Sequence, residues 1–250
     1  MPGVKSSDAI RVEGLHKSFG DWPVLWDLDL TVGWGEFLAL FGANGSGKTT
    51  LLRVLSTQAR PEAGTVLVAG YHHRRQAQAI RQNIGVVGHH SFLYEDLTCR
   101  ENLMFYGRLF GIKDIQQRVE AVLSTVGLSR RADQRVRTLS HGMQKRLAIA
   151  RAILHQPAIL LLDEPEGGLD RESVVMLDHL LEEWTGAGRT VIMTTHNLEL
   201  GLSWADRVAV LADGKLYFQE PAQYLDAANL QQMLAASSSA AAKRPLETRP

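Results

Sequence analysis

The sequence predicts a layered α/β domain that is interrupted by a group of helices. Two observations support this fold class. Short apolar runs with β propensity, followed later by alternating strand and helix patterns, lie on either side of the middle of the chain. Between residues 97 and 154 the pattern changes, because apolar residues recur there at spacings of three and four, as on one face of a helix.

Composition narrows the function classes. The 250 residues carry 27 Lys plus Arg and 27 Asp plus Glu, so the net charge is zero and broad electrostatic binding to nucleic acid is excluded. The single cysteine, Cys99, excludes an intrachain disulfide or a multi-cysteine zinc site. No apolar run approaches the roughly 18 to 20 residues that span a bilayer. We therefore expect an intracellular chain with no nucleic-acid partner, no membrane span and no export signal.

The elements follow in order along the chain. Gly33 and Gly35 interrupt the second apolar segment, and Asp213 with Gly214 predicts the turn of a hairpin over residues 207–219. Helices are predicted at 171–184 and 198–205 in addition to the central group. The predicted strands outside the hairpin are 10–20, 28–41, 64–70, 84–88, 158–163 and 190–196.

The segment Gly42–Thr49 follows a predicted strand, opens a helix and fits the pattern G-x-x-x-x-G-K-[ST]. Glycines let the backbone wrap around phosphate groups, and the helix N-terminus adds positive potential. Lys48 can reach the β- and γ-phosphates, and the Thr49 hydroxyl can bind Mg²⁺. The candidate phosphate-binding residues are Gly42, Asn44, Gly45, Ser46, Gly47, Lys48, Thr49 and Thr50.

Two acidic residues end the apolar run Ile159–Leu162. A buried strand that ends in a carboxylate can deliver Asp163 to Mg²⁺, and Glu164 can then orient or deprotonate a water molecule. Alone, the pattern fits equally well a solvated strand end that happens to be acidic. Together with the glycine loop, it predicts a site for a magnesium-bound nucleoside triphosphate.

A third segment, Leu139–Met143, opens an apolar-faced helix. Ser140 is a favoured N-cap residue, and Gly142 permits close approach of a backbone or ligand. The N-terminus of this helix can receive an anion. Taken by itself, the segment is better explained as an ordinary capped helix.

Taken together and in this order, the segments resemble the nucleotide-binding subunit of ABC transporters over about residues 9–220. Leu139–Met143 resembles the family's LSGGQ signature, with His141 and Met143 as departures. Asp163–Asp170 resembles the Walker B and D-loop block, with Glu166 where a small or aromatic residue is more usual. Thr195-His196 resembles the switch-histidine loop, and Lys17–Gly20 resembles the segment whose aromatic residue stacks on adenine.

The resemblance implies a P-loop NTPase fold, with a RecA-like core, an antiparallel β subdomain and an inserted α-helical subdomain. One domain would cover residues 1–235, with the core at about 1–88 and 155–235 and the helical subdomain at about 89–154. Residues 236–250 are small and polar, and they are predicted to be a disordered tail.

The resemblance also implies a chemistry. ATP would be hydrolysed to ADP and phosphate in a head-to-tail homodimer. Glu164 and His196 would be catalytic and Phe19 would stack on the adenine. Ser140 and Gly142 would meet the γ-phosphate of the other copy, and Asp170 would link the two sites. Integral membrane permease subunits would hold the chain at the cytoplasmic face of the cell membrane, through the helical insert and the loop at 89–98.

His89 stands where the family usually has a glutamine that faces Mg²⁺ or the water molecule. A glutamine offers a side-chain oxygen, whereas an imidazole offers a neutral ring nitrogen or, when charged, only donors. His89 is a candidate catalytic residue on position alone. An alternative without much turnover, a nucleotide-gated binding module, therefore stays open.

Cargo is predicted from one further resemblance. Residues 84–109 resemble the ATP-binding subunit of the haem exporter of cytochrome c maturation, where a Gly-His pair also occurs. We therefore expect haem export. The alternative is a generic ABC-2-type exporter of a drug, a lipid or another small molecule. Only 92 positions separate Lys48 from Ser140, which leaves no room for the long coiled coils of chromosome-maintenance ATPases.

Overall fold

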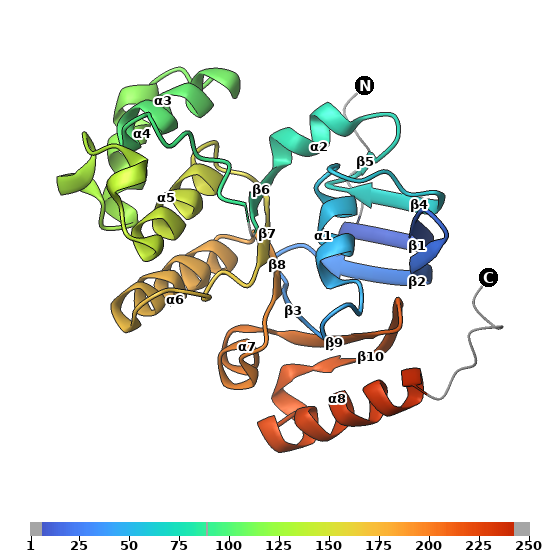
Figure 1. The fold of residues 1–250 in the computed structure, drawn as a ribbon. Coiled ribbons are helices and arrows are strands. Elements are labelled where there is room, and N and C mark those ends of the chain that lie inside the picture. Colours follow the sequence, from blue (N-terminus) through green and yellow to red (C-terminus); the bar gives the residue numbers. More distant parts are fainter. Residues whose placement is uncertain (1–6, 89, 243–250) are drawn as a thin grey trace.

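A computed structural model describes residues 7–88 and 90–242, and a six-stranded sheet forms its centre (Figure 1). The strand order is β10-β9-β3-β8-β7-β6, in which all neighbours are parallel except β9 and β10. The bounds are β3 (Phe37–Phe41), β6 (Ile84–Val87), β7 (Ile159–Asp163), β8 (Thr190–Thr194), β9 (Arg207–Ala212) and β10 (Lys215–Pro221).

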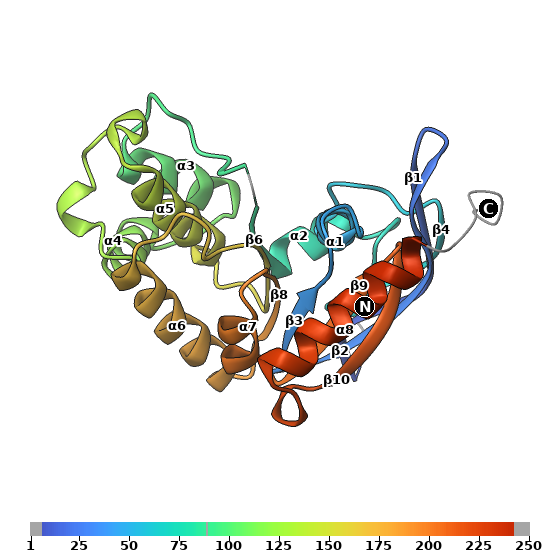
Figure 2. The ribbon, with the colours of Figure 1, turned by 60° about the horizontal axis from the view of Figure 1, so that its bottom comes forward.

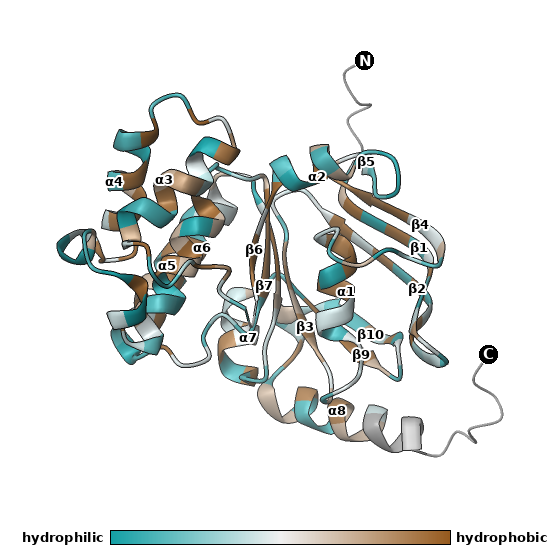
Figure 3. Ribbon diagram, turned by 45° about the horizontal axis from the view of Figure 1, so that its top comes forward, coloured by the Kyte–Doolittle hydropathy of each residue, from teal (hydrophilic) through white to brown (hydrophobic). Residues whose placement is uncertain are grey.

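The central strands of this sheet are buried on both faces. Every residue of β3, β7 and β8 is buried, which explains why these strands are continuous apolar runs rather than alternating ones. Figure 3 shows the central strands mainly in brown, the colour of hydrophobic residues. Since the strands are parallel, their carboxyl ends meet at one edge, where ligands of α/β sheets usually bind.

A four-stranded sheet of order β2-β1-β4-β5 lies beside the first one. All its pairs are antiparallel. Its inner face and the six-stranded sheet enclose helix α1 (Lys48–Leu55) in one apolar core. The bounds are β1 (Asp8–Phe19), β2 (Trp22–Gly33), β4 (Ala63–Val68) and β5 (Tyr71–His72).

A group of helices lies at the opposite end of the molecule from the four-stranded sheet (Figure 2). The group packs with α6 and the other face of the six-stranded sheet into a second core. Thr98 and Glu101 form a capping box that starts α3. The group consists of α3 (Cys99–Leu109), α4 (Ile115–Thr125) and α5 (His141–Ile153). The helices outside the group, besides α1, are α2 (Ala77–Asn83), α6 (Arg171–Gly186), α7 (Leu198–Trp204) and α8 (Ala227–Ala242).

The predicted α/β fold class is confirmed, and the helices α3 to α5 lie inside the segment predicted to be helical. The precise limits of the core and the helical subdomain stay proposals. The tail prediction is wrong over residues 236–242, where α8 continues, because alanine strongly favours helix. Residues 243–250 lie outside the described residues. Within the described part of the chain, no helix is both long and apolar enough to cross a membrane.

Candidate functional site

The glycine loop between β3 and α1 has the backbone geometry of an anion cradle. Gly45 and Gly47 have φ angles of 79° and 109°, which favour glycine. A Cβ atom on Gly42 would lie 2.3 Å from the Leu211 carbonyl oxygen, and one on Gly47 would lie 2.6 Å from a Leu25 methyl group. No side chain caps α1, so its first N–H groups are free to face a ligand.

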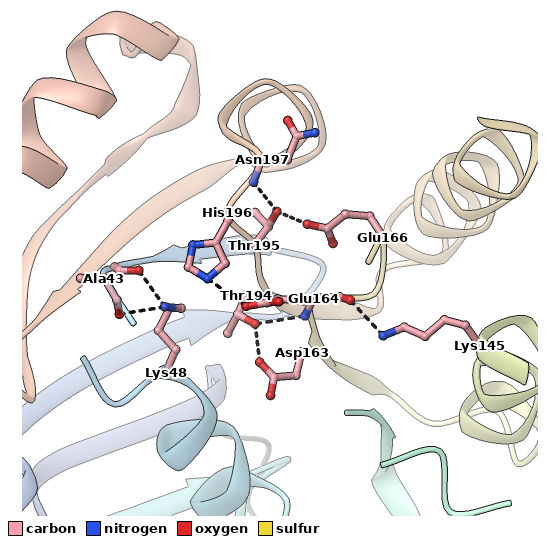
Figure 4. A network of polar contacts seen from close by, with 11 residues as sticks. Ala43, Lys48, Lys145, Asp163, Glu164, Glu166, Thr194, Thr195, His196 and Asn197 are labelled. Atoms are coloured by element: carbon pink, nitrogen blue, oxygen red, sulfur yellow. Dashed lines mark hydrogen bonds and ion pairs between the residues drawn. The ribbon is translucent and has the colours of Figure 1, made fainter. Parts of the chain in front are cut away.

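Lys48 points back across this loop (Figure 4). Its Nζ atom donates hydrogen bonds to the carbonyl oxygens of Gly42, at 2.7 Å, and Ala43, at 3.1 Å. Burial lowers the pKa of Lys48, while the negative charges of Glu164 and Asp163 oppose that shift. The ammonium group is thus held at the loop, under the influence of the carboxylates of Asp163, which ends β7, and Glu164, which follows it.

Asp163, the last residue of β7, is buried and accepts a hydrogen bond of 2.6 Å from the Thr194 hydroxyl. Asp163 lines a cavity of about 420 Å³ together with Thr49, the residue after Lys48 on α1. A hydroxyl and a carboxylate are hard oxygen ligands of the kind that Mg²⁺ prefers. The donor set therefore fits the magnesium ion implied by the sequence, with water or a phosphate group completing its coordination.

Glu164 and His196 form a pair, with Glu164 Oε1 lying 2.9 Å from His196 Nε2. The two side chains are partly exposed and line a cavity of about 560 Å³ together with the glycine loop and Lys48. Glu164 has a φ angle of 48°, and its N–H group donates to the backbone and side-chain oxygens of Thr194. One cavity thus collects a phosphate-type loop, an ammonium group, a carboxylate and an imidazole.

Ser140 and Gly142, at the start of α5, lie outside that cavity. The Ser140 hydroxyl accepts a hydrogen bond of 3.3 Å from the Met143 N–H group, as an N-cap does. His141 lines a separate cavity of about 290 Å³ with Lys145, Glu164 and other residues. The N-termini of α1 and α5 are therefore separate candidate anion sites, and of these two only that of α1 lines the cavity of Glu164 and His196.

Asp170 is exposed and caps α6, where it accepts a hydrogen bond of 2.8 Å from the Ser173 N–H group. Hydrogen bonding from the Ser173 side chain, and then from its backbone N–H group, lowers the pKa of Asp170. Phe19 ends β1 and is 45% exposed, with the Lys17 ammonium 5.0 Å from its ring centroid. Neither residue lines the loop cavity. His89 lies outside the described residues.

Two charged residues beside Glu164 were not predicted as site residues. Lys145 on α5 donates a hydrogen bond of 2.9 Å to the Glu164 carbonyl oxygen, and Glu166 accepts one from the Thr195 hydroxyl. The only signal in the sequence was the unusual acidic residue at position 166. In the described part of the chain, no group of three or more His, Cys, Asp or Glu side chains is arranged to hold a metal ion.

Comparisons with known proteins agree with this geometry. A family model described as ABC transporter matches residues 25–167. The chain is 39% identical over 221 residues to the daunorubicin resistance ATP-binding protein DrrA3 of Streptomyces coeruleorubidus, covering 88% of this chain and 70% of the relative. It is 36% identical over 216 residues to the Nod factor export ATP-binding protein I of Ralstonia nicotianae, covering 86% of this chain and 67% of the relative.

The fold is also similar to a solved structure, the dimeric post-hydrolysis state of the ATP-binding cassette MJ0796 bound to ADP and Pi. The TM-score is 0.80 at 27% sequence identity, and the match covers 85% of this chain and 98% of that one. The chain therefore belongs to the ABC transporter family as an ATP-binding subunit, and its enzymatic activity is the hydrolysis of ATP to ADP and phosphate.

Proposed function

We propose that this chain is the motor subunit of an exporter for a small organic molecule. The single observation that carries the motor assignment is the cavity shared by the glycine loop, Lys48, Glu164 and His196. The export assignment is supported by relatives whose names refer to daunorubicin resistance and to Nod factor export. Neither name refers to haem, so the expected haem export is unsupported and we favour the generic exporter.

In the proposed site the triphosphate lies along the glycine loop and the N-terminus of α1. Lys48 exchanges its hydrogen bonds to the loop carbonyls for bonds to the β- and γ-phosphates. Thr49 and Asp163 would hold Mg²⁺, which would supply positive charge to offset the negative charge of the triphosphate. Phe19 stacks on the adenine without reading its polar edge, since an exposed ring offers only its face.

Glu164 is the proposed base. Its carboxylate is partly exposed at the loop cavity, so it can reach a water molecule that lies there. His196 holds one carboxylate oxygen at 2.9 Å, which leaves the other oxygen to orient or deprotonate that water molecule. His196 itself lies beside the γ-phosphate in this arrangement. The tie between Glu164 and His196 makes the position of the base depend on the 195–197 turn.

The proposed active form is a head-to-tail homodimer. Ser140 and Gly142 do not line the loop cavity of their own chain, and in this proposal a second copy brings them to the γ-phosphate. Asp170 lies on the segment between β7 and α6, in which Gly168 approaches His141 at the start of α5, and in this proposal it links the two sites. The relative solved as a dimer with ADP and Pi supports this assembly.

Membrane permease subunits are the second proposed partner, and they would place the chain at the cytoplasmic face of the membrane. The segment before α3 and α3 itself present Phe92, Tyr94 and Phe105, which are exposed. The Tyr94 and Phe105 rings meet edge to face with centroids 5.0 Å apart. Such an exposed aromatic patch beside the 420 Å³ cavity suits a helix of a permease subunit.

Co-expression of the chain with its membrane subunits tests this proposal. We expect Glu164→Gln to lower ATP hydrolysis by at least about a hundredfold, since it removes the base, and to trap the ATP-bound dimer. Glu172→Gln, an exposed acidic residue in the first turn of α6, is the matched control and should keep wild-type activity.

Two results would contradict the proposal. If the wild-type complex hydrolyses ATP no faster than Glu164→Gln, the chain is a nucleotide-gated binding module rather than a motor. If a detergent pull-down recovers no membrane protein with either ATP or ADP, the permease assignment is wrong. An absorption spectrum of the purified complex that shows bound haem would favour haem export over export of another small molecule.

A further inference from the structure

Lys145 and Glu166 form a charged network around the Glu164–His196 pair (Figure 4). Lys145 comes from α5, while Glu166 follows β7. We infer that both are positioning residues that fix the orientation of Glu164 and His196 and connect it to the start of α5. This inference rests on the proposed role of that pair in hydrolysis. Nothing in the chemistry proposed above requires either residue.

Lys145 fixes the backbone of Glu164. Its Nζ atom donates a hydrogen bond of 2.9 Å to the Glu164 carbonyl oxygen, while Thr194 accepts from the N–H group on the other side of the same residue. Glu164 has a left-handed backbone with a φ angle of 48°, which a non-glycine residue holds only when neighbouring contacts impose it. The two anchors therefore set the direction in which the carboxylate points.

Glu166 fixes the turn that carries His196. Its Oε1 atom accepts a hydrogen bond from the Thr195 hydroxyl, and the same hydroxyl accepts one of 2.9 Å from the Asn197 N–H group. The hydroxyl thus bridges both sides of His196 and ties them to Glu166. Losing the Glu166 carboxylate leaves the Thr195 hydroxyl without its acceptor, so the imidazole can rotate away from Glu164.

Charge explains why the two residues belong to one network. Glu166 Oε2 is buried and has no hydrogen-bond partner among the described residues. Burial lowers the pKa of Lys145, and the charge of Glu166 is the largest of the three carboxylate charges that oppose this shift. A partly buried carboxylate without a nearby cation is costly, so removing either charge destabilises the other.

The network begins on the helix whose N-terminus is proposed to meet the nucleotide of the other copy. Lys145 lies on α5, which starts beside Ser140, and its hydrogen bond ends on the base of its own chain. Movement of α5 would therefore reach the Glu164–His196 pair directly. The network couples the opposite nucleotide site to the orientation of the local base.

The test compares Lys145→Met, Glu166→Gln and Thr195→Val with the exposed control Glu172→Gln, in the complex with its membrane subunits. We expect Lys145→Met and Thr195→Val to lower kcat about tenfold with KM for ATP within twofold, since the first removes the hydrogen bond to the Glu164 carbonyl oxygen and the second removes both hydrogen bonds of the Thr195 hydroxyl. Glu166→Gln keeps an acceptor for Thr195, so kcat should fall less. The double variant Lys145→Met/Glu166→Gln should lose less than the product of the single losses.

A second readout does not depend on hydrolysis. In the nucleotide-free chain, the ¹⁵N signals of the His196 ring should shift in Lys145→Met and Thr195→Val and stay in place in Glu172→Gln. Unchanged ring signals together with kcat within twofold of wild type would overturn the inference. A fall in KM alone, or fully independent effects in the double variant, would also overturn it. If wild type is no faster than Glu164→Gln, the proposed motor fails, and the ring signals still decide the network.

Discussion

The N-termini of α1 and α5 differ in how their first backbone N–H groups are used. Helix α1 has no side-chain cap, and two glycines of its preceding loop, Gly42 and Gly47, leave no room for a Cβ atom. Helix α5 has Ser140 as its cap, and that hydroxyl already accepts from Met143. The first terminus offers several free N–H groups to an anion, whereas the second has used one of them for its own stability.

The surroundings of the α1 and α5 N-termini also differ. The α1 terminus shares a cavity with Lys48, Glu164 and His196. Ser140 and Asp170 are exposed instead and each caps its own helix. In the proposed function, the α1 terminus is therefore a binding site within a single chain, and the α5 terminus is a surface that serves the site of a second copy. The predictions below separate these two properties.

The largest expected effect is at the first terminus. Lys48→Ala should weaken ATP binding about a hundredfold, because a buried charge-assisted contact to phosphate is worth about 2 to 3 kcal/mol. Titration with a fluorescent ATP analogue measures it. Lys113→Ala, on an exposed lysine, is the control and should change nothing. Equal affinities of Lys48→Ala and wild type would show that the loop does not bind phosphate.

A smaller effect is expected at the second terminus. In a Glu164→Gln background, Ser140→Ala should weaken ATP-induced dimer formation by roughly thirtyfold, since about 2 kcal/mol of hydrogen bonding is lost across the interface. Binding of the ATP analogue to the monomer should stay within twofold, and light scattering after size exclusion reports the dimer. A loss of monomer affinity instead would mean that Ser140 serves the site of its own chain.

Adenine stacking should contribute less. Phe19→Ala should weaken ATP and GTP binding equally, by about fivefold to tenfold, which corresponds to the lower part of the range for base–aromatic stacking. Trp22→Ala is the matched comparison, because Trp22 pairs with Phe19 across the β1–β2 turn and is 69% exposed. If only the Trp22 variant binds more weakly, the stacking role belongs to Trp22.

The smallest expected effect is on the free energy of unfolding and comes from His155, which lies at neither the α1 nor the α5 N-terminus. Burial lowers the pKa of His155 to about 4, while its Nε2–H group donates to the Ile84 carbonyl oxygen and its buried Nδ1 lacks a described partner. The unfolded chain binds this proton below its ordinary pKa of 6.5 and the folded chain does not. Stability from His155 is therefore complete above pH 6.5 and falls as pH drops toward 4.

Urea unfolding at pH 7.5 and pH 6.0 measures this contribution, which should be about 1 kcal/mol between the two values. In His155→Gln the difference between the two pH values should shrink by that amount. His179→Gln, on an exposed histidine of α6, is the control and should leave the difference as in wild type. An unchanged pH dependence in His155→Gln would show that His155 does not titrate as described.

Local patterns explain how much of the fold and site could be predicted. The glycine loop and the end of β7 are each defined by a few consecutive residues, so their spacing predicts them. Helix α2 was missed because it buries only Ile80 and shows no apolar periodicity. Lys145 and Glu166 were missed because their relation exists only after α5 packs beside the segment that follows β7. Sequence spacing cannot predict such a tertiary contact.

The close approach of His141 to Gly168 has a consequence for sequence design. A Cβ atom on Gly168 would lie 2.6 Å from the His141 Nδ1 atom, and the Gly168 backbone has a φ angle of 76°. The imidazole thus fills the space that a side chain at position 168 would need. Because a positive φ strains any residue with a Cβ atom, a smaller residue at 141 would relieve only the steric conflict: a library that varies both positions should yield functional chains mainly with glycine at 168.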